Sequence, residues 1–120
     1  MVKFYEKFIE ERRIKKIYHN LVSNLLTIFQ DNLKEVILFG SYARGEESED
    51  SDLDIIAIVD LSPEKLKDYR EEILKIQLDI LNQWDLVASI LLQSEKEYQK
   101  YKNVLLLFYN IKKEGVKLYG

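Results

Sequence analysis

Residues 53–59 read Leu-Asp-Ile-Ile-Ala-Ile-Val, and this short run constrains the fold more than any other part of the chain. All but one of its side chains are apolar, so neither side of the run is suited to water. A strand that is apolar on both sides is typical of the centre of a sheet with helices on its faces. The run therefore predicts an α/β fold in which residues 53–59 form a central strand.

Two further elements are expected before this strand. Apolar residues recur at helical spacing over residues 4–30, which predicts one long helix with a basic outer face. Residues 35–39 (Glu-Val-Ile-Leu-Phe) form a β-rich apolar run that ends at Gly40, which predicts a strand. The helix is expected to bury Phe4, Phe8, Ile14, Ile17, Leu21, Leu25 and Ile28.

The remaining elements follow the central strand. Ser62-Pro63 is a helix start, which predicts a helix over 63–84 and then a third strand over 85–92. A capping box at 94–97 opens a last helix to about Glu114, and Gly115 is its C-cap. Residues 116–119 are suited to a short edge strand. The order predicts a small mixed β-sheet of three or four strands flanked by helices, in one domain over residues 1–120.

Composition excludes several classes of function. The chain has 120 residues, no cysteine and one histidine, which excludes thiol catalysis and a zinc site built from cysteines or several histidines. It has no apolar run long enough for a membrane span and no signal peptide, so a cytoplasmic protein is expected.

The charge of the chain is concentrated in one segment. Residues 46–54 hold six acidic residues and no basic one, while the net charge of the whole chain is only −3. The overall acidity argues against direct binding of nucleic acid. An acidic block of this kind is either a solvated loop or a cation site.

Two common phosphate and metal motifs fail here. Gly40 to Gly45 has the spacing of a phosphate-binding P-loop, but Glu46 stands where that loop requires lysine. Asp50, Asp52 and Asp54 have the spacing of an EF-hand, but Ile55 stands at its glycine position. A solvated loop without function explains Asp54 poorly, because a lone carboxylate entering a buried strand is costly.

The better interpretation combines a cation site with an anion site. Asp52 and Asp54 are two residues apart on a strand, so their side chains point to the same face. Two such carboxylates suit Mg²⁺ or Mn²⁺. Gly40 permits close approach of a ligand, Ser41 offers a hydroxyl at the start of a short helical turn, and Arg44 fits phosphate oxygens. Together these residues indicate metal-assisted phosphoryl or nucleotidyl transfer.

Gly40-Ser41, ten residues and Asp52-Leu53-Asp54 resemble the signature of the DNA polymerase beta-like nucleotidyltransferases. The intervening Tyr42-Ala43-Arg44-Gly45-Glu46 resembles the minimal nucleotidyltransferase branch in particular. The resemblance covers residues 35–60 and extends loosely to the C-terminus.

The resemblance implies ATP, or a related nucleotide, bound with Mg²⁺. Asp52 and Asp54 would ligate the metal, Gly40 and Ser41 would hold the β and γ phosphates, and Arg44 would lie near the nucleotide. A third carboxylate, expected one strand later, would ligate metal and activate the attacking hydroxyl. Asp85 is the candidate, and another alignment puts Ser89 at this position.

The resemblance also implies a partner. Chains of this kind are often paired with a helical HEPN protein in a toxin–antitoxin system, and they transfer AMP to a tyrosine of that partner. Two other functions stay open: a non-catalytic antitoxin that neutralises its partner by occlusion, and nucleotidylation of a small molecule. No membrane partner is expected, and an oligomer stays open.

Overall fold

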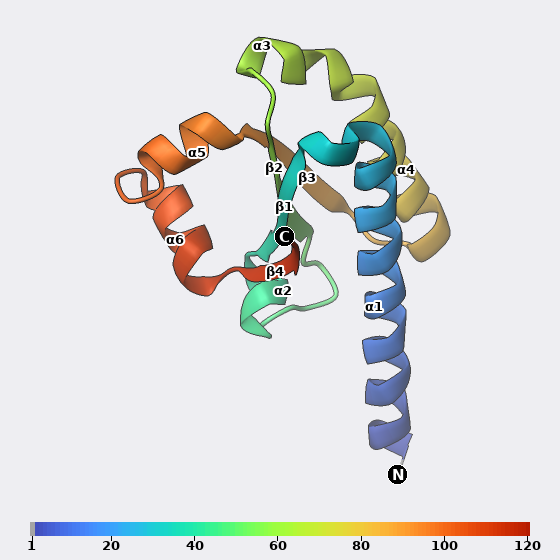
Figure 1. Cartoon of the computed structure of the whole chain (residues 1–120). Helices are drawn as coiled ribbons and strands as arrows, with labels where there is room; N and C mark the ends of the chain where they lie inside the picture. The colour runs from blue at the N-terminus through green and yellow to red at the C-terminus, as the bar shows by residue number, and fades with distance from the viewer. Residues whose placement is uncertain (1) are drawn as a thin grey trace.

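The structure, a computed structural model, describes residues 2–120, without the side chains of residues 2–5 and Phe8. Phe4 and Phe8, expected in the core, therefore have side chains outside the described part. The chain forms a mixed sheet with helices on both faces (Figure 1). The elements are α1 (Val2–Phe29), η1 (Gln30–Asn32), β1 (Leu33–Phe39), α2 (Ser41–Arg44), β2 (Leu53–Val59), α3 (Pro63–Leu66), η2 (Lys67–Tyr69), α4 (Arg70–Trp84), β3 (Ala88–Ser94), α5 (Glu95–Tyr101), α6 (Leu106–Glu114) and β4 (Val116–Tyr119).

The sheet has the strand order β3-β2-β1-β4. β1 is antiparallel to both β2 and β4, while β2 and β3 are parallel. β2 is central, as its apolar sequence predicts, and β4 is the short edge strand expected at residues 116–119. The predicted fold class, a small mixed sheet of three or four strands with flanking helices, is confirmed.

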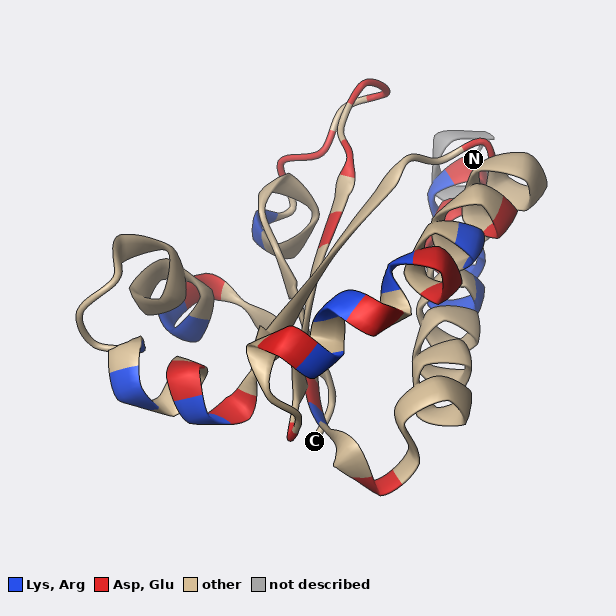
Figure 2. Cartoon of the chain, turned by 90° about the horizontal axis from the view of Figure 1, so that it is seen from above, with Lys and Arg blue, Asp and Glu red and all other residues tan. Residues whose placement is uncertain are grey.

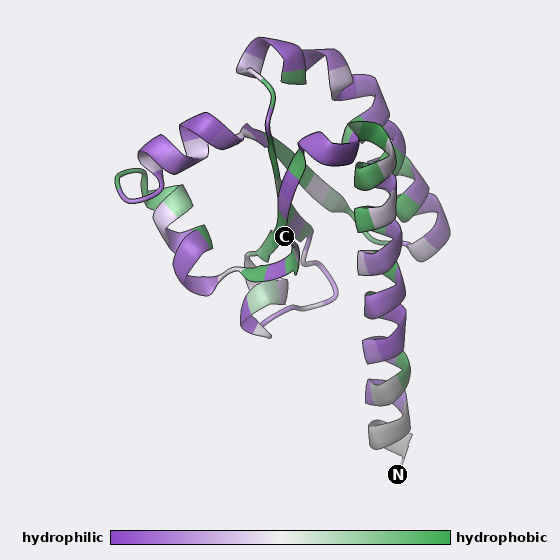
Figure 3. Ribbon diagram, in the orientation of Figure 1, coloured by the Kyte–Doolittle hydropathy of each residue, from purple (hydrophilic) through white to green (hydrophobic). Residues whose placement is uncertain are grey.

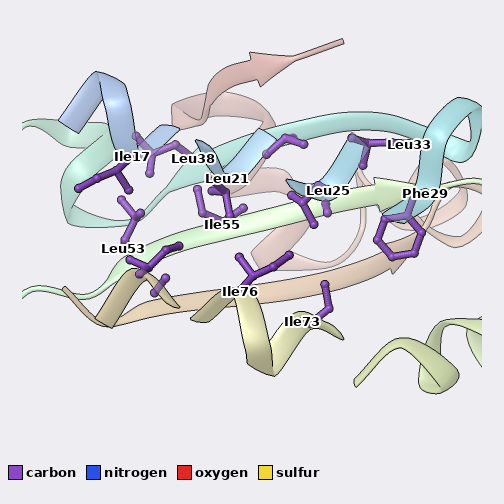
Figure 4. Close-up of a cluster of buried hydrophobic side chains, with 14 of the residues drawn as sticks. Ile17, Leu21, Leu25, Phe29, Leu33, Leu38, Leu53, Ile55, Ile73 and Ile76 are labelled. Carbon is purple, nitrogen blue, oxygen red and sulfur yellow. The ribbon is translucent and has the colours of Figure 1, made fainter. Parts of the chain in front are cut away.

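One face of the sheet, called here the first face, is covered by α1 and α4. Side chains at alternate positions of β2 point to it and are at most 1% exposed: Leu53, Ile55, Ala57 and Val59. Ile17, Leu21 and Leu25 of α1 and Ile73 and Ile76 of α4 pack against them (Figure 4). Figure 3 shows hydrophobic residues in the part of α1 that lies beside the sheet. Alternation along β2 and helical spacing along α1 produce this core.

The opposite face, the second face, has a smaller cover. Ile56 and Ile58 of β2 pack there with Ile37 of β1 and with side chains of α5 and α6. The rings of Tyr98 and Phe108, one from each helix, lie 5.2 Å apart between centroids. This cluster covers the middle of the second face, and Asp54 lies on the same face at the start of β2.

Two predicted helices are each divided in the structure. The helix expected over 63–84 is broken by η2 at 67–69, which lets α3 lie against β3 while α4 covers the first face. The helix expected over 95–114 is broken by a turn at 102–105, because Tyr98 and Phe108 must reach the same apolar cluster. A single straight helix would place these two side chains about 15 Å apart along its axis.

Of three residues at element ends, one behaves as predicted and two differ. Ser62 caps α3, as predicted, through a hydrogen bond from the Lys65 N–H (3.3 Å). Ser94 is the N-cap of α5, but its side chain makes no capping hydrogen bond, so the capping box does not form. The third strand begins at Ala88 instead of 85, because Asp85 takes a left-handed conformation that ends α4. Within residues 2–120, no helix is long and apolar enough to cross a membrane.

Candidate functional site

The candidate site is built where β1 ends and β2 begins. The antiparallel register pairs Phe39 with Asp54, so Gly40 and α2 lie beside the first residues of β2. The acidic segment predicted as a loop connects α2 to β2, and Figure 2 shows it as a projecting red loop. The antiparallel pairing of β1 and β2 thus brings Gly40 and Ser41 close to Asp52 and Asp54.

Gly40 is required by two features of this corner. Its φ is +77° and its ψ is −157°, a region that residues with a side chain rarely adopt. A Cβ atom at Gly40 would also collide with Oδ2 of Asp54. The carboxylate of Asp54 therefore lies directly against the bare Cα of Gly40, which explains why a side chain does not fit at this position.

The pKa of Asp54 is shifted by its burial and by two neighbouring charges. Partial burial raises the pKa of its carboxyl, the charge of Asp52 raises it further, and the charge of Arg44 lowers it. Asp52 and Arg44 therefore both lie close enough to act on the Asp54 carboxyl. Two like charges beside a single arginine leave the pair of carboxylates suited to a further cation.

Arg44 is held by two carboxylates. Its Nε donates to Oε2 of Glu46 (3.1 Å), and its NH1 lies 3.8 Å from Oε2 of Glu114 at the end of α6. Sequence reasoning did not identify Glu114 as part of the site, because about seventy positions separate it from Arg44 and no local motif links them. All three side chains are partly exposed, so a competing anion can reach the guanidinium.

Ser41 begins α2, which is one turn long. The first hydrogen bonds of this turn run from the N–H groups of Ala43 and Arg44 to Gly40 O (3.1 and 3.2 Å). The N–H groups of Ser41 and Tyr42 precede these donors and point out of the start of the turn. The predicted helical turn at Ser41 is thus present, with Gly45 in a left-handed conformation as its C-cap.

A cleft of about 910 Å³ lies beside the site. It is lined by residues of α1, including Tyr18, by Tyr42, by the acidic loop over 47–50, and by Asp85. Burial raises the pKa of Tyr18 to about 12, with the charges of Tyr42 and Glu47 adding to the effect. Tyr42 itself is half-buried and packs against the core of the first face.

The third predicted carboxylate is not grouped with the other two. Asp85 caps α4, with φ +53° and its N–H bonded to Leu81 O (2.9 Å), and its side chain lines the cleft just described. Within residues 2–120, no three acidic or histidine side chains are arranged to hold a metal ion. In the parallel register, Ser89 lies beside Asp54. The role of Asp85 as ligand and base stays a prediction.

The residues present fit a divalent cation that is shared with a substrate. Mg²⁺ is commonly held by one or two carboxylates together with phosphate oxygens. Asp52 and Asp54 supply such a pair, since they lie two residues apart on one face of the sheet at the start of β2. The start of α2 and Arg44 supply groups for an anion on the neighbouring strand end.

Comparison with known proteins agrees with this geometry. Residues 21–117 match the family described as the nucleotidyltransferase domain. A relative from Methanocaldococcus jannaschii, named "Putative protein adenylyltransferase MJ0604", is 32% identical over 92% of this chain and 98% of its own length. This chain belongs to the nucleotidyltransferase domain family, as the motif over residues 40–54 predicts.

Further similarities are more restricted. The protein adenylyltransferase MntA of Thermococcus cleftensis is 36% identical over 48% of this chain and 64% of its own length. A chain from a toxin–antitoxin crystal structure with AMP-PNP superposes with a TM-score of 0.57 at 17% identity, covering 86% of this chain and 73% of that one. A chain from a mutant form of the toxin–antitoxin MntA-HpeT gives 0.53 at 18% identity, covering 85% and 72%. At such identities the two structures establish the shared fold.

Proposed function

We propose that this chain transfers AMP from ATP, with Mg²⁺, to a tyrosine hydroxyl of a helical HEPN-type partner protein and so acts as an antitoxin. One observation carries the proposal: the Asp54 carboxylate lies against Gly40, within the electrostatic reach of Asp52 and Arg44. The names of the relatives, protein adenylyltransferases, support a protein acceptor. The toxin–antitoxin complexes of the same fold support the antitoxin role.

The reaction joins the acceptor oxygen to the α-phosphorus of ATP. The bond between that phosphorus and the bridging oxygen of pyrophosphate breaks, and the acceptor hydroxyl loses its proton. A bound Mg²⁺ would neutralise the charge that develops on the phosphate oxygens. Asp52 and Asp54 would hold this ion, while Gly40 and Ser41 hold the β and γ phosphates.

Arg44 contributes a fixed positive charge at the nucleotide. Glu46 and Glu114 orient its guanidinium in the protein without nucleotide. Because both ion pairs are exposed and hence weak, a triphosphate can replace either carboxylate as the partner of Arg44. The guanidinium of Arg44 is thus available to a phosphate group beside Gly40 and Ser41.

The group that accepts the proton is the next part of the proposal to test. Asp85 would have to act from the cleft at the end of α4, and Ser89 beside Asp54 cannot serve as a base of comparable strength. If Asp85 is the base, Asp85→Asn lowers transfer strongly and leaves ATP affinity unchanged. Ser89→Ala is the matched control, and it leaves transfer within about twofold of the wild type.

A second candidate function rests on a different observation: Asp85 is not grouped with Asp52 and Asp54. A chain in which no third carboxylate of the described residues joins Asp52 and Asp54 would neutralise its partner by occlusion alone. The test uses purified chain, ATP, Mg²⁺ and a HEPN-type protein of the same genome, followed by intact mass measurement of both chains. Addition of one adenylyl group to the partner, lost in Asp52→Asn, supports transfer. A tight complex without any addition supports occlusion.

A further inference from the structure

A small pocket on the second face concentrates positive charge. It measures about 270 Å³ and lies between α5, α6, β4 and the start of β1. Its lining includes one acidic residue, Glu35, and three lysines, Lys102, Lys112 and Lys117, and it is called here the lysine pocket. The three lysines come from the end of α5, from α6 and from β4. The periodicity of a single element therefore does not explain why they converge.

The charge of the lysine pocket contrasts with the rest of the molecule. Residues 99–120 hold five lysines and one acidic residue, although the whole chain has a net charge of −3. The cleft beside the candidate site is lined by six acidic and two basic residues. A groove of about 560 Å³ between α4 and β3 is lined mainly by apolar side chains. The lysine pocket differs from both in its excess of basic residues.

Two of the three ammonium groups are bonded to neutral side chains. Lys102 Nζ donates to Oε1 of Gln99 (2.6 Å), and Lys112 Nζ donates to Oδ1 of Asn103 (3.3 Å). In the described part of the chain, neither ammonium forms an ion pair with a carboxylate. Glu95, in the first turn of α5, lies about 10 Å from Lys102 along the helix axis. Two positive charges of the lining therefore have no carboxylate in contact.

The acidic residues around the pocket are engaged elsewhere or with the third lysine. Oε1 of Glu35 lies 2.8 Å from Lys117 Nζ, so these two lining charges neutralise each other. Glu114 follows Lys113 on α6, but its Oε2 lies 3.8 Å from Arg44. Glu97 of α5 lines the groove between α4 and β3. The excess positive charge thus stays with the lysine pocket.

A buried hydroxyl group also belongs to this pocket. Tyr98 lines it and is 4% exposed, while its ring packs against Phe108. Burial raises the pKa of Tyr98, the charge of Glu35 raises it further, and the charge of Lys117 lowers it, so the hydroxyl lies near that ion pair. Within the described residues, this hydroxyl makes no hydrogen bond. A buried polar group without a partner is costly, and a ligand in the pocket would supply one.

We propose that the lysine pocket binds a small dianion of the phosphate class, either inorganic phosphate or the phosphate monoester of a small molecule. The ammonium groups of Lys102 and Lys112 balance its two negative charges, and the Tyr98 hydroxyl donates to a third oxygen. A phosphate group has three strong acceptor oxygens and so matches three donors on different elements. Pockets for drug-sized ligands begin at about 300 Å³, so this pocket suits a ligand smaller than a nucleotide.

The lysine pocket is separate from the candidate nucleotide site. Glu35 lies near the start of β1 and Gly40 follows its end, about 16 Å farther along the strand. Residues 40–54, all of which the structure describes, do not line the pocket. Binding of phosphate at the lysine pocket therefore does not depend on the proposed function.

Titration of the isotope-labelled chain with inorganic phosphate, followed by nuclear magnetic resonance, tests this site. Sodium chloride keeps the ionic strength constant. We expect saturable shifts of the amide signals of Tyr98, Gly115 and Lys117, with a dissociation constant of about 1 mM. A parallel titration with glycerol phosphate separates the two sources. Tighter binding of glycerol phosphate assigns the pocket to a phosphorylated small molecule, and weaker binding assigns it to free phosphate.

Two matched pairs of variants locate the bound anion. Lys112→Gln should raise the dissociation constant for phosphate about fivefold or more, because it removes a donor from the pocket. Lys113→Gln removes the same charge from the next position of α6, outside the lining, and should stay within about twofold of the wild type. Tyr98→Phe should weaken binding about fivefold while keeping the ring. Tyr101→Phe, on the same helix and outside the lining, should have no effect.

Three results would overturn the proposal. The first is a set of shifts that do not saturate and that chloride alone reproduces. The second is an equal loss of affinity in Lys112→Gln and Lys113→Gln, which would mean that phosphate responds only to net charge. The third is binding confined to residues 40–54, which would leave the proposed function intact and the lysine pocket empty. Should Lys112→Gln fail to fold, Lys102→Gln with Lys100→Gln as its control replaces that pair.

Discussion

The two faces of the sheet differ in function, although alternate side chains of β2 contribute to both. Along β2, alternate side chains from Leu53 to Val59 are buried under α1 and α4 on the first face. The intervening Ile56 and Ile58 are buried on the second face, but Asp54, next in that series, is not. A strand with period two can therefore stabilise the fold on one face and present chemistry at one end of the other.

The largest expected effect is on the second face. Asp54→Asn removes one of the two carboxylates, and we expect transfer to fall about 10³-fold, a loss of several kcal/mol of transition-state stabilisation. The far-ultraviolet spectrum should not change. Asp50→Asn, in the exposed acidic loop, is the matched control and should keep full activity. Equal losses in both variants would mean that bulk negative charge, and not the position of Asp54, matters.

Substitutions in the core of the first face should change the stability of the fold. Leu25 of α1 is fully buried, and Leu25→Ala should lower the free energy of unfolding by about 2–5 kcal/mol. Ile9→Ala, at an exposed position of the same helix, should change it by less than about 0.5 kcal/mol. Urea unfolding measures both. A loss of specific activity in Leu25→Ala, at temperatures where it is folded, would contradict the division of tasks between the faces.

A glycine pair isolates the contact between Gly40 and Asp54. Gly40 and Gly45 both have positive φ, +77° and +69°, but a Cβ at Gly45 meets nothing within 4 Å. Gly45→Ala should therefore cost only the backbone strain, about 1 kcal/mol. Gly40→Ala should cost this and also displace the Asp54 carboxylate, lowering ATP affinity about tenfold or more. Calorimetric titration with ATP and Mg²⁺ compares the two; equal affinities would mean that the contact is unimportant.

The smallest expected effect is on the pH dependence of stability in the absence of metal. Burial and Asp52 raise the pKa of Asp54 above 3.8, so the folded protein keeps this proton to a higher pH than the unfolded chain. The ionised carboxylate therefore lowers stability above the raised pKa, and this cost disappears as the pH falls toward 3.8. Asp54→Asn should melt about 1 °C higher than wild type at pH 7. The difference should vanish in acid, and Mg²⁺ should reverse it, because the ion would stabilise the wild type through Asp52 and Asp54 while the variant lacks one of these two carboxylates.

The sequence predicts the central strand, the long first helix and the Gly40–Asp54 corner, because these depend on local periodicity and on short spacings. It does not predict the break at 102–105, which exists so that Tyr98 and Phe108 can share one cluster. It also misses the ion pair of Arg44 with Glu114, which arises only when α6 returns to the site. The third strand begins later than the sequence predicts, since the left-handed Asp85 has no strong sequence signal.

The central claim is that the open end of the second face holds a metal-bound nucleotide. The most direct test is a crystal structure of the chain with a non-hydrolysable ATP analogue and Mg²⁺. We expect the triphosphate at Gly40, Ser41 and Arg44, with the ion on Asp52 and Asp54. A nucleotide bound elsewhere, for example in the groove between α4 and β3, would contradict the account.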